Sequence, residues 1–362
     1  MKVQTKGVLI MAGGTGGHIF PGLAVADSLR GHGVAVRWLG ASGAMECRRV
    51  PAAGIELDTV DISGLRGKGI GRWLAMPWRL ARAVYQAFCI LGARRPACAI
   101  SFGGYAAGPG GLAARLRGVP LLVHEQNRVP GMTNRVLARM AKMVLQAFPG
   151  TWGENRHART CGNPVRGPVV SLAAPMERLS GRSGTKRLLI TGGSQGARFL
   201  NHMIPAALAM LPPGERPEVR HQTGTGGLEA TSKHYREAGI KAEVCAFIDD
   251  MAGAYGWADL VVCRSGALTV SELAAAGVAA VLVPFPFAVD DHQSRNAEFL
   301  VEAGAAEMMP EADCDAQSMA AVLGRLLGSR EDLMRMACAA RAVSVPDSAE
   351  RVAALCMEFM PA

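Results

Sequence analysis

The feature that most constrains the fold is a short apolar run that enters a helical segment through a glycine-rich turn, because it occurs twice. Val8–Ala12 leads into Gly13-Gly-Thr-Gly-Gly-His18, and Arg187–Thr191 leads into Gly192-Gly-Ser-Gln-Gly-Ala197. A buried strand followed by a glycine turn and a helix is the opening of a βαβ unit. Its return in the second half of a 362-residue chain predicts two similar halves.

Further apolar runs alternate with helix or turn signals in both halves. They are 34–39, 97–102, 120–123 and 143–148 in the first half, and 218–221, 242–247, 259–263 and 279–285 in the second. The first helix is expected from Pro21 to Leu29. The pattern predicts an α/β chain with two doubly wound parallel sheets, with ligands at the carboxyl ends of the strands in a cleft between facing loops. The weakly patterned stretch 162–184 is the expected linker.

Composition excludes several other classes. Forty-four glycines beside 5% aromatic residues argue against a β-sandwich, and nine cysteines without a CxxC pair argue against a zinc site and indicate reduced thiols in a cytosol. The run Val8–Ala12 is too short for the core of a signal peptide. The longest uncharged stretches, 96–114 and 273–289, are interrupted by glycine and proline, so we expect no spanning helix.

The positive charge is concentrated in one part of the chain. Residues 62–153 contain thirteen lysines and arginines and one carboxylate, Glu125. Such asymmetry indicates a polyanionic partner. Within it, basic and bulky apolar residues are interleaved, which favours a helix lying on an anionic membrane over core packing with a solvated arginine face. The residues of this expected membrane patch are Lys68, Arg72, Trp73, Leu74, Trp78, Arg79 and Arg82. A nucleic-acid partner is not expected, because no stacking platform accompanies the charge.

The glycine turns match neither of two common nucleotide motifs. No GxGxxG with a following acidic residue and no GxxxxGK[ST] can be found, which disfavours a dehydrogenase and a P-loop NTPase. Backbone N–H groups at a helix N-terminus still suit phosphate. The alternative is that the glycines only permit close packing of strand and helix.

Three candidate catalytic residues follow strands of the first half. His18 comes directly after the glycine turn and could act as a neutral base, or merely cap the helix. Tyr105 lies in a third glycine-rich loop, 101–111. Glu125 belongs to the polar run His124–Asn127, which we expect at a ligand-facing strand end since a buried strand would not tolerate it. A salt bridge with an arginine is the alternative for Glu125.

The second half offers a nucleotide-binding pattern. In the segment Cys263–Glu272, N–H groups from Gly266 to Leu268 could face a diphosphate, and Glu272 could accept both ribose hydroxyls. The polar segment Asp290–Asn296 can hydrogen-bond sugar hydroxyls. Asp290 and Asp291 lack a third ligand at suitable spacing, so no metal site is expected.

Together these segments resemble the MurG family of peripheral membrane transferases, which add N-acetylglucosamine to the lipid-linked muramyl-peptide precursor of peptidoglycan. The resemblance spans nearly the whole chain. It is carried by 13–18 with 20–22, 62–68, 103–105, 124–127, 162–166, 192–197, 247–251 and 263–272.

The resemblance implies a GT-B fold with two Rossmann-like domains. The expected parts are an acceptor and membrane-associating domain over 1–165, a UDP-N-acetylglucosamine domain over 166–340, and a final helix within 341–362 that packs on the first domain. The implied UDP-N-acetylglucosamine contacts are Thr15, Gly16, Gly17, Asn127, Arg166, Ser194, Ile248, Ala267, Leu268, Thr269, Val270, Ser271, Glu272 and Gln293. Among them, Ile248 would hold uracil by its backbone, Glu272 the ribose, and Ser194 the phosphates. Phe287 stands where relatives often carry histidine.

The implied reaction is an inverting displacement by the 4-hydroxyl of N-acetylmuramic acid in undecaprenyl-pyrophosphoryl-MurNAc-pentapeptide. His18 is the first choice for the base and Glu125 the second, while Tyr105 and Asn127 would orient the substrates. Helix N-termini would stabilise the leaving diphosphate, with no metal and no cofactor. The expected location is the cytoplasmic face of the inner membrane, with cell-wall synthesis and division proteins as partners. A UDP-N-acetylglucosamine 2-epimerase of the same architecture is the alternative.

Overall fold

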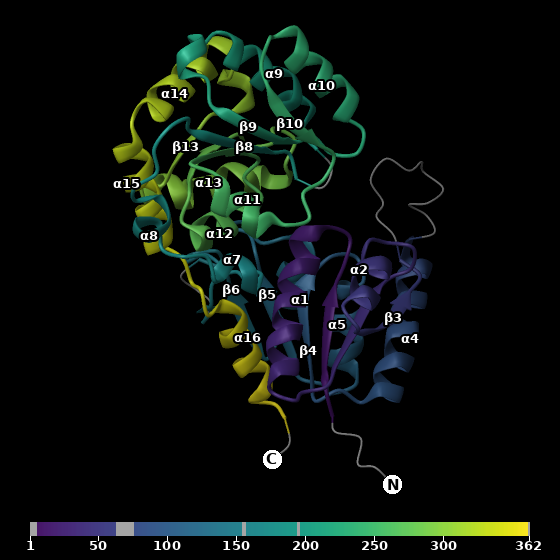
Figure 1. Ribbon diagram of the computed structural model, residues 1–362. Helices are drawn as coiled ribbons and strands as arrows, with labels where there is room; N and C mark the ends of the chain where they lie inside the picture. Colours follow the sequence, from purple (N-terminus) through teal and green to yellow (C-terminus); the bar gives the residue numbers. More distant parts are fainter. Residues whose placement is uncertain (1–5, 63–75, 154–156, 194–195, 361–362) are drawn as a thin grey trace. The chain divides into compact units, whose positions relative to one another are not determined.

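The structure, a computed structural model, describes residues 6–62, 76–153, 157–193 and 196–360 (Figure 1). The chain divides into two compact units. One comprises residues 1–166 and 345–362, and the other comprises residues 167–344. Each unit is built on its own parallel sheet.

The described part of the first unit has one seven-stranded sheet in the order β3-β2-β1-β4-β5-β6-β7. Its strands are β1 Val8–Ala12, β2 Val36–Ala41, β3 Glu56–Val60, β4 Cys98–Gly103, β5 Leu121–Glu125, β6 Met143–Gln146 and β7 Arg159–Thr160. Its helices are α1 Gly16–Gly31, α2 Glu46–Ala52, α4 Met76–Arg94, α5 Ala107–Leu116, α6 Met132–Leu137 and α16 Ser348–Met357. Apolar clusters fill both faces, so every residue of β1 is buried and the strand is an unbroken apolar run.

The second unit repeats this plan with a six-stranded sheet in the order β10-β9-β8-β11-β12-β13. Its strands are β8 Arg187–Thr191, β9 Glu218–Gln222, β10 Ala242–Cys245, β11 Leu260–Cys263, β12 Ala279–Leu282 and β13 Ala306–Met308. Its α-helices are α7 Gly167–Val170, α8 Pro175–Leu179, α9 Arg198–Ala209, α10 Leu228–Glu237, α11 Met251–Trp257, α12 Ala267–Ala276, α13 His292–Glu302, α14 Ala316–Gly328 and α15 Arg330–Ala342.

In each sheet the strand order reverses at the first strand of the unit, β1 or β8. β1 pairs in parallel with β2 and β4, and β8 pairs in parallel with β9 and β11. In doubly wound sheets ligands bind beyond the carboxyl ends of the strands at this switch point. The predicted α/β class with two doubly wound parallel sheets is confirmed, and each glycine turn follows the strand at the switch point.

The last helix, α16, belongs to the first unit although the second unit precedes it in the chain (Figure 1). Val352, Ala353 and Cys356 of α16 are fully buried in the core that also contains residues of α1. At the surface, Glu350 accepts a hydrogen bond from the Ser28 hydroxyl at 2.6 Å. Residues that follow the second unit in the sequence therefore complete the first core.

Some boundaries differ from those expected. α1 begins at Gly16 rather than at the expected Pro21. Pro21 lies inside the helix and not at the first helical position, which proline usually takes. β3, β7 and β13 had no predicted counterpart, and all three are edge strands. An edge strand buries less surface than a central one, so it need not be an apolar run.

The chain passes from the first unit to the second between Arg166 and Gly167, within the expected linker 162–184. The residues that follow include α7 and α8 of the second unit. Among the helices that the structure describes, none combines the length and the apolar character needed to cross a membrane.

Candidate active site

The first glycine turn and the loop after β4 are in direct backbone contact. A Cβ on Gly104 would lie 2.3 Å from the Gly13 carbonyl oxygen, and Gly104 has a φ of +91°. Only glycine allows this approach in this conformation. The two loops therefore present their next side chains, His18 and Tyr105, at the same edge of the sheet.

His18 lies in the first turn of α1. Its Nδ1 atom is 3.2 Å from the Thr15 hydroxyl oxygen, and its ring lies against Gly103, where a Cβ would come within 3.2 Å of the ring. The imidazole is half-buried. The imidazole lies beside the N-terminal end of α1, and an imidazole must be neutral to accept a proton.

Tyr105 is half exposed, with 50% of its surface accessible. The nearest atom of its ring would be 3.8 Å from a Cβ on Gly14. The phenol therefore lies over the glycine turn, beside the segment that carries His18.

Glu125, by contrast, is only 1% exposed and is fully engaged. Oε1 accepts hydrogen bonds from the backbone and side-chain amides of Asn127, both at 3.0 Å, and Oε2 accepts from Gly131 N at 3.1 Å and Asn134 Nδ2 at 2.9 Å. Both carboxylate oxygens therefore have amide partners inside the first unit. These hydrogen bonds hold the loop before α6 to the end of β5.

The expectation that the polar run His124–Asn127 faces a ligand was wrong for its first three residues. His124, Glu125 and Gln126 are each at most 1% exposed. The His124 ring bonds the Gly162 carbonyl at 3.0 Å, and burial lowers the pKa of His124 to about 4. A buried strand end tolerates these side chains because most of their polar atoms have partners inside the protein.

Asn127 and Arg166 remain half-buried at the edge of the first unit. The Asn127 side chain donates to Glu125, so its orientation is fixed. The Arg166 guanidinium lies 5.1 Å from the ring centre of Phe20, which in turn would be 3.0 Å from a Cβ on Gly16. Arg166 thereby flanks the helix start formed by Gly16 and Gly17.

In the second unit, the described residues that are expected to contact UDP-N-acetylglucosamine follow β10, β11 and β12 in the sequence. α12 begins at Ala267, directly after β11, with Gly266 as its N-terminal cap. The N–H groups of the first turn, Ala267, Leu268 and Thr269, have no partners within a helix and can face an anion. Val270 is different, since its side chain is fully buried and its N–H donates to Gly266 O at 3.0 Å.

Glu272 lies deeper than expected for a ribose ligand. It is 4% exposed, and the Tyr255 hydroxyl donates to its Oε2 atom at 3.2 Å. The neighbouring Ser271 hydroxyl donates to Ala267 O at 2.9 Å. Both side chains therefore have partners inside the second unit.

Ile248 follows β10 and is half-buried, and Gln293 lies in the first turn of α13. Gln293 Oε1 accepts from Phe285 N at 2.9 Å, which fixes the loop after β12 and presents the amide Nε2 for other partners. In that loop, Phe287 is 80% exposed and packs edge-on against Phe285. Ser194 lies outside the described residues.

Two buried residues near the first glycine turn escaped the sequence analysis. Asn134 of α6 accepts from the Ser101 hydroxyl and donates to His124 O and Glu125, so it ties the ends of β4 and β5 together. Glu46 of α2 accepts from Gly14 N. Both act through tertiary contacts, and no local pattern around either residue signals them.

The expected membrane patch is described only in part. Lys68, Arg72, Trp73 and Leu74 lie outside the described residues. α4 turns Ala83, Ala87 and Leu91 to the core, whereas Trp78 is 79% exposed and Tyr85 68%. Core packing therefore does not account for Trp78.

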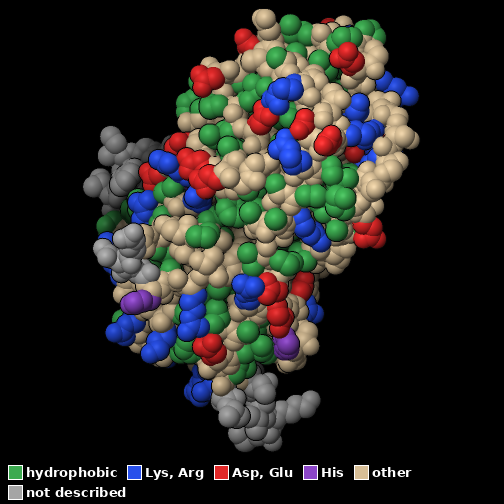
Figure 2. Space-filling model, turned by 90° about the vertical axis from the view of Figure 1, so that its left-hand side faces the viewer, with side chains coloured by type: hydrophobic (Ala, Val, Ile, Leu, Met, Phe, Trp, Pro, Cys, Tyr) green, Lys and Arg blue, Asp and Glu red, His purple; other side chains and the backbone are tan. Residues whose placement is uncertain are grey.

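The positive charge of this region is smaller than the sequence count suggested. Arg82 pairs with Asp61 at 2.9 Å, and Arg94 pairs with Asp58 at 2.9 Å and lies 3.6 Å from Glu56. These carboxylates precede residue 62 and were outside the segment counted. On the face of the second unit that carries α8 and α15, basic and acidic side chains are interspersed (Figure 2).

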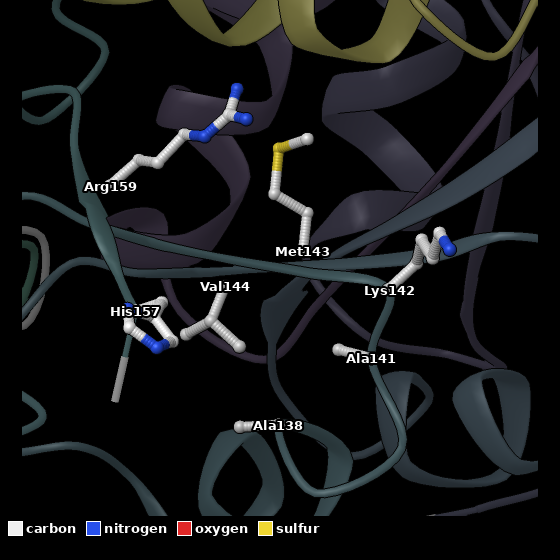
Figure 3. A pocket seen from close by; sticks show the side chains of 7 residues that line it. All are labelled: Ala138, Ala141, Lys142, Met143, Val144, His157 and Arg159. Atoms are coloured by element: carbon white, nitrogen blue, oxygen red, sulfur yellow. The ribbon is translucent and has the colours of Figure 1, made fainter. Parts of the chain in front are cut away.

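A cavity of about 430 Å³ lies elsewhere in the first unit. Its lining includes Lys142 and Met143 at the start of β6 and Arg159 in β7, and its other residues are Ala138, Ala141, Val144 and His157. The nitrogens of Lys142, His157 and Arg159 point in different directions (Figure 3). Lys142 and Met143 mark the amino end of β6, opposite to the glycine turns, so this cavity is separate from the candidate active site.

Proteins of known family match this chain over nearly its whole length. Residues 8–146 match the glycosyltransferase family 28 N-terminal domain, and residues 187–352 match the family 28 C-terminal domain. A protein of Aeromonas hydrophila named UDP-N-acetylglucosamine–N-acetylmuramyl-(pentapeptide) pyrophosphoryl-undecaprenol N-acetylglucosamine transferase is 54% identical over 98% of this chain and 97% of its own. A Marinobacter nauticus protein of the same name is 52% identical over 97% of this chain and 96% of its own. The crystal structure of Acinetobacter baumannii MurG matches with a TM-score of 0.84 and 40% identity, covering 98% of this chain and 99% of that one.

The chain belongs to the MurG family. Membership in the MurG family confirms the predicted GT-B fold and the glycosyltransferase class. A putative UDP-N-acetylglucosamine 2-epimerase from Listeria monocytogenes shares the fold, with a TM-score of 0.67 at 14% identity. Because the epimerase matches in fold alone, the extensive identity to MurG transferases is what separates the two activities.

Proposed function

We propose that this chain moves N-acetylglucosamine from UDP-N-acetylglucosamine to the 4-hydroxyl of N-acetylmuramic acid in undecaprenyl-pyrophosphoryl-MurNAc-pentapeptide. The observation that carries the proposal is the 54% identity, over 98% of the chain, to a transferase named for that reaction. The acceptor hydroxyl attacks the anomeric carbon from the side opposite to UDP, so the configuration inverts.

In this proposal, His18 takes the proton of the attacking hydroxyl. When Nδ1–H donates to the Thr15 hydroxyl, 3.2 Å away, Nε2 carries the lone pair that accepts the proton. Tyr105 orients the acceptor beside it. Glu125 contributes by fixing Asn127, which contacts the donor together with Thr15, Gly16, Gly17 and Arg166.

The second unit binds the nucleotide part of the donor in this proposal. The free N–H groups at the start of α12 stabilise the charge that develops on the departing diphosphate. Ile248 holds uracil through its backbone, Ser194 contacts the phosphates, and Gln293 offers its amide to the sugar. Glu272, which accepts a hydrogen bond from the Tyr255 hydroxyl, contacts the ribose. Because the departing charge meets N–H groups, we expect transfer without a divalent cation.

We also propose that α4 attaches the enzyme peripherally to the cytoplasmic face of the plasma membrane, where the lipid acceptor resides. Trp78, Arg82 and Tyr85 recur at helical spacing on its exposed side. Exposed aromatic and basic side chains on one helix suit an anionic lipid surface.

The deciding experiment measures UDP release from UDP-N-acetylglucosamine in EDTA, with and without a lipid-pyrophosphoryl-MurNAc-pentapeptide analogue. We expect release only with the acceptor, and a loss of kcat of about 100-fold or more in His18→Ala, as for removal of a general base. His202→Ala is the control, since His202 lies on α9 of the second unit. Release without acceptor would favour an epimerase or a hydrolase, and full activity of His18→Ala would remove His18 from the mechanism.

A further inference from the structure

Glu46 is a completely buried carboxylate beneath the first glycine turn. It opens α2 and is 0% exposed. Its Oε2 atom accepts a hydrogen bond from Gly14 N at 3.1 Å, and its Oε1 atom accepts from Ala41 N at 2.8 Å. The carboxylate thus joins the end of β2 to the turn that follows β1.

Two glycines make room for this side chain. A Cβ on Gly13 would lie 2.2 Å from Glu46 Oε1, and a Cβ on Gly40 would lie 2.6 Å from Glu46 Cγ. The absence of a side chain at residue 13 therefore serves the buried carboxylate. The N–H of Gly14 is already occupied by Glu46, so it is not offered to a phosphate.

The turn held by Glu46 carries the groups that would perform the transfer. Gly14 adjoins Thr15, whose hydroxyl contacts His18, and the Tyr105 ring lies over Gly14. A shift of Gly14 would move Thr15, and with it the partner that orients the imidazole.

Burying a carboxylate is costly unless hydrogen bonds replace the lost water. An apolar side chain could fill the same space without that cost, so packing alone does not explain the carboxylate. Its two acceptor atoms do explain it, since they fix two backbone N–H groups from different strand ends in one geometry.

We infer that Glu46 is a positioning residue for the transfer reaction, because its carboxylate holds the Gly13–Thr15 turn in the conformation that directs His18 at the acceptor hydroxyl. This inference rests on the proposed function. Glu46 touches no substrate and acts through Gly14 and Thr15.

The test is Glu46→Gln in the full chain, with kcat and KM measured for both substrates. Glutamine has the same shape but turns an N–H₂ group toward one of two N–H donors, so one hydrogen bond is lost. Since a misplacement of about 1 Å can cost about 100-fold in rate, we expect kcat to fall between about 10- and 100-fold. The KM for UDP-N-acetylglucosamine should change less than about threefold, because the nucleotide is held by other residues.

A matched control separates positioning from stability. Asp259 is also a buried carboxylate, 3% exposed, which accepts from Arg187 N at 2.9 Å and pairs with Arg182. It directly precedes β11 and so lies at the amino edge of its sheet. Asp259→Asn should lower the melting temperature and leave kcat of the folded enzyme unchanged. Glu46→Gln should lower kcat at a temperature where it is fully folded.

Two further variants make the inference falsifiable. In a His18→Ala background, Glu46→Gln should cause no further loss of kcat, since both changes act on one proton transfer. If Glu46→Gln does not fold, Gly40→Ala displaces the carboxylate by its Cβ and should lower kcat in the same direction. Unchanged kcat in these variants, or additive losses in the double variant, would overturn the positioning role. A wild-type chain without acceptor-dependent release would overturn the proposed function and the inference together.

Discussion

Because His124 is buried, we expect the free energy of unfolding of the first unit to fall in acid. Burial lowers the pKa of His124 from the ordinary histidine value of 6.5 to about 4. Because the folded-state pKa lies below the unfolded one, the unfolded chain binds the proton first. The contribution of the neutral ring to stability is therefore complete above about pH 6.5 and is lost as the pH falls toward 4. At about 1.4 kcal/mol per pH unit, the loss is about 3 kcal/mol.

Urea unfolding at pH 7 and pH 4 measures this loss. Four of the five tryptophans belong to the first unit, so their fluorescence reports mainly on it. His124→Gln can still donate to Gly162 O but does not ionise, so its free energy of unfolding should fall by about 3 kcal/mol less than that of the wild type over this interval. Equal losses in the two proteins would contradict the assignment. His221, whose pKa burial lowers to about 3, titrates equally in both.

For individual residues, the sequence predicted which side chains follow the strand ends, but not which of them face outward. His18 and Tyr105 are at the predicted edge and partly exposed. Glu125 follows a strand in the same way, yet four amide donors enclose it. Those donors come from a loop and a short helix whose path depends on tertiary packing, and the same holds for Glu46. The sequence of a turn therefore predicts at which strand end a side chain lies, whereas its hydrogen-bond partners decide whether the side chain is available to a substrate.

Among the elements, α4 carries a testable membrane contact. Its exposed side presents Trp78 and Tyr85, while Arg82 is paired with Asp61. We expect Trp78→Ser with Tyr85→Ser to weaken binding to vesicles of zwitterionic and anionic lipid by about 100-fold or more, because burial of each of the two aromatic rings contributes about 1.5 kcal/mol or more. Arg82→Gln removes one positive charge from the same side and should weaken binding to a smaller extent, because Arg82 is already paired with Asp61.

Sedimentation with vesicles measures this partition. Met210→Ser is the matched control, since Met210 is an exposed apolar residue, 54% accessible, at the end of α9 in the second unit. UDP release with a water-soluble acceptor analogue should be the same in all variants. If the double variant binds vesicles as well as the wild type, the described part of α4 does not attach the enzyme.

The central strands and the helices after them were predictable, because burial on both faces leaves continuous apolar runs. The hydrogen bonds that hold the C-terminal end of α12 were not predictable. Arg178 donates to the carbonyls of Ala276 and Gly277 at 2.8 and 2.6 Å, and Arg341 donates to Ala275 O. These arginines satisfy the end of α12 from distant parts of the chain. Burial is the main reason why the pKa of Arg178 is lowered to about 10. No local pattern specifies such a cap.

For the whole molecule, repetition of one strand–turn–helix pattern was enough to predict two sheets of one design. The closure of the first core by the end of the chain has a different origin. Val352 of α16 is fully buried beside α1, yet the entire second unit separates the two helices in sequence. The stability of the first unit therefore depends on residues that follow the second unit in the sequence.

Val352→Ala tests this dependence by hydrogen–deuterium exchange resolved along the chain. Loss of two buried methyl groups should destabilise the first unit by about 2 kcal/mol. Globally exchanging amides in β1, β4 and α1 should then exchange about 30-fold faster, while those in residues 187–344 keep their rates. Leu323→Ala, in the core of the second unit at 0% exposure, should give the reciprocal result. Faster exchange of β8 and β11 in Val352→Ala would mean that the two units unfold as one, since a local loss beside α1 would then be shared by both sheets.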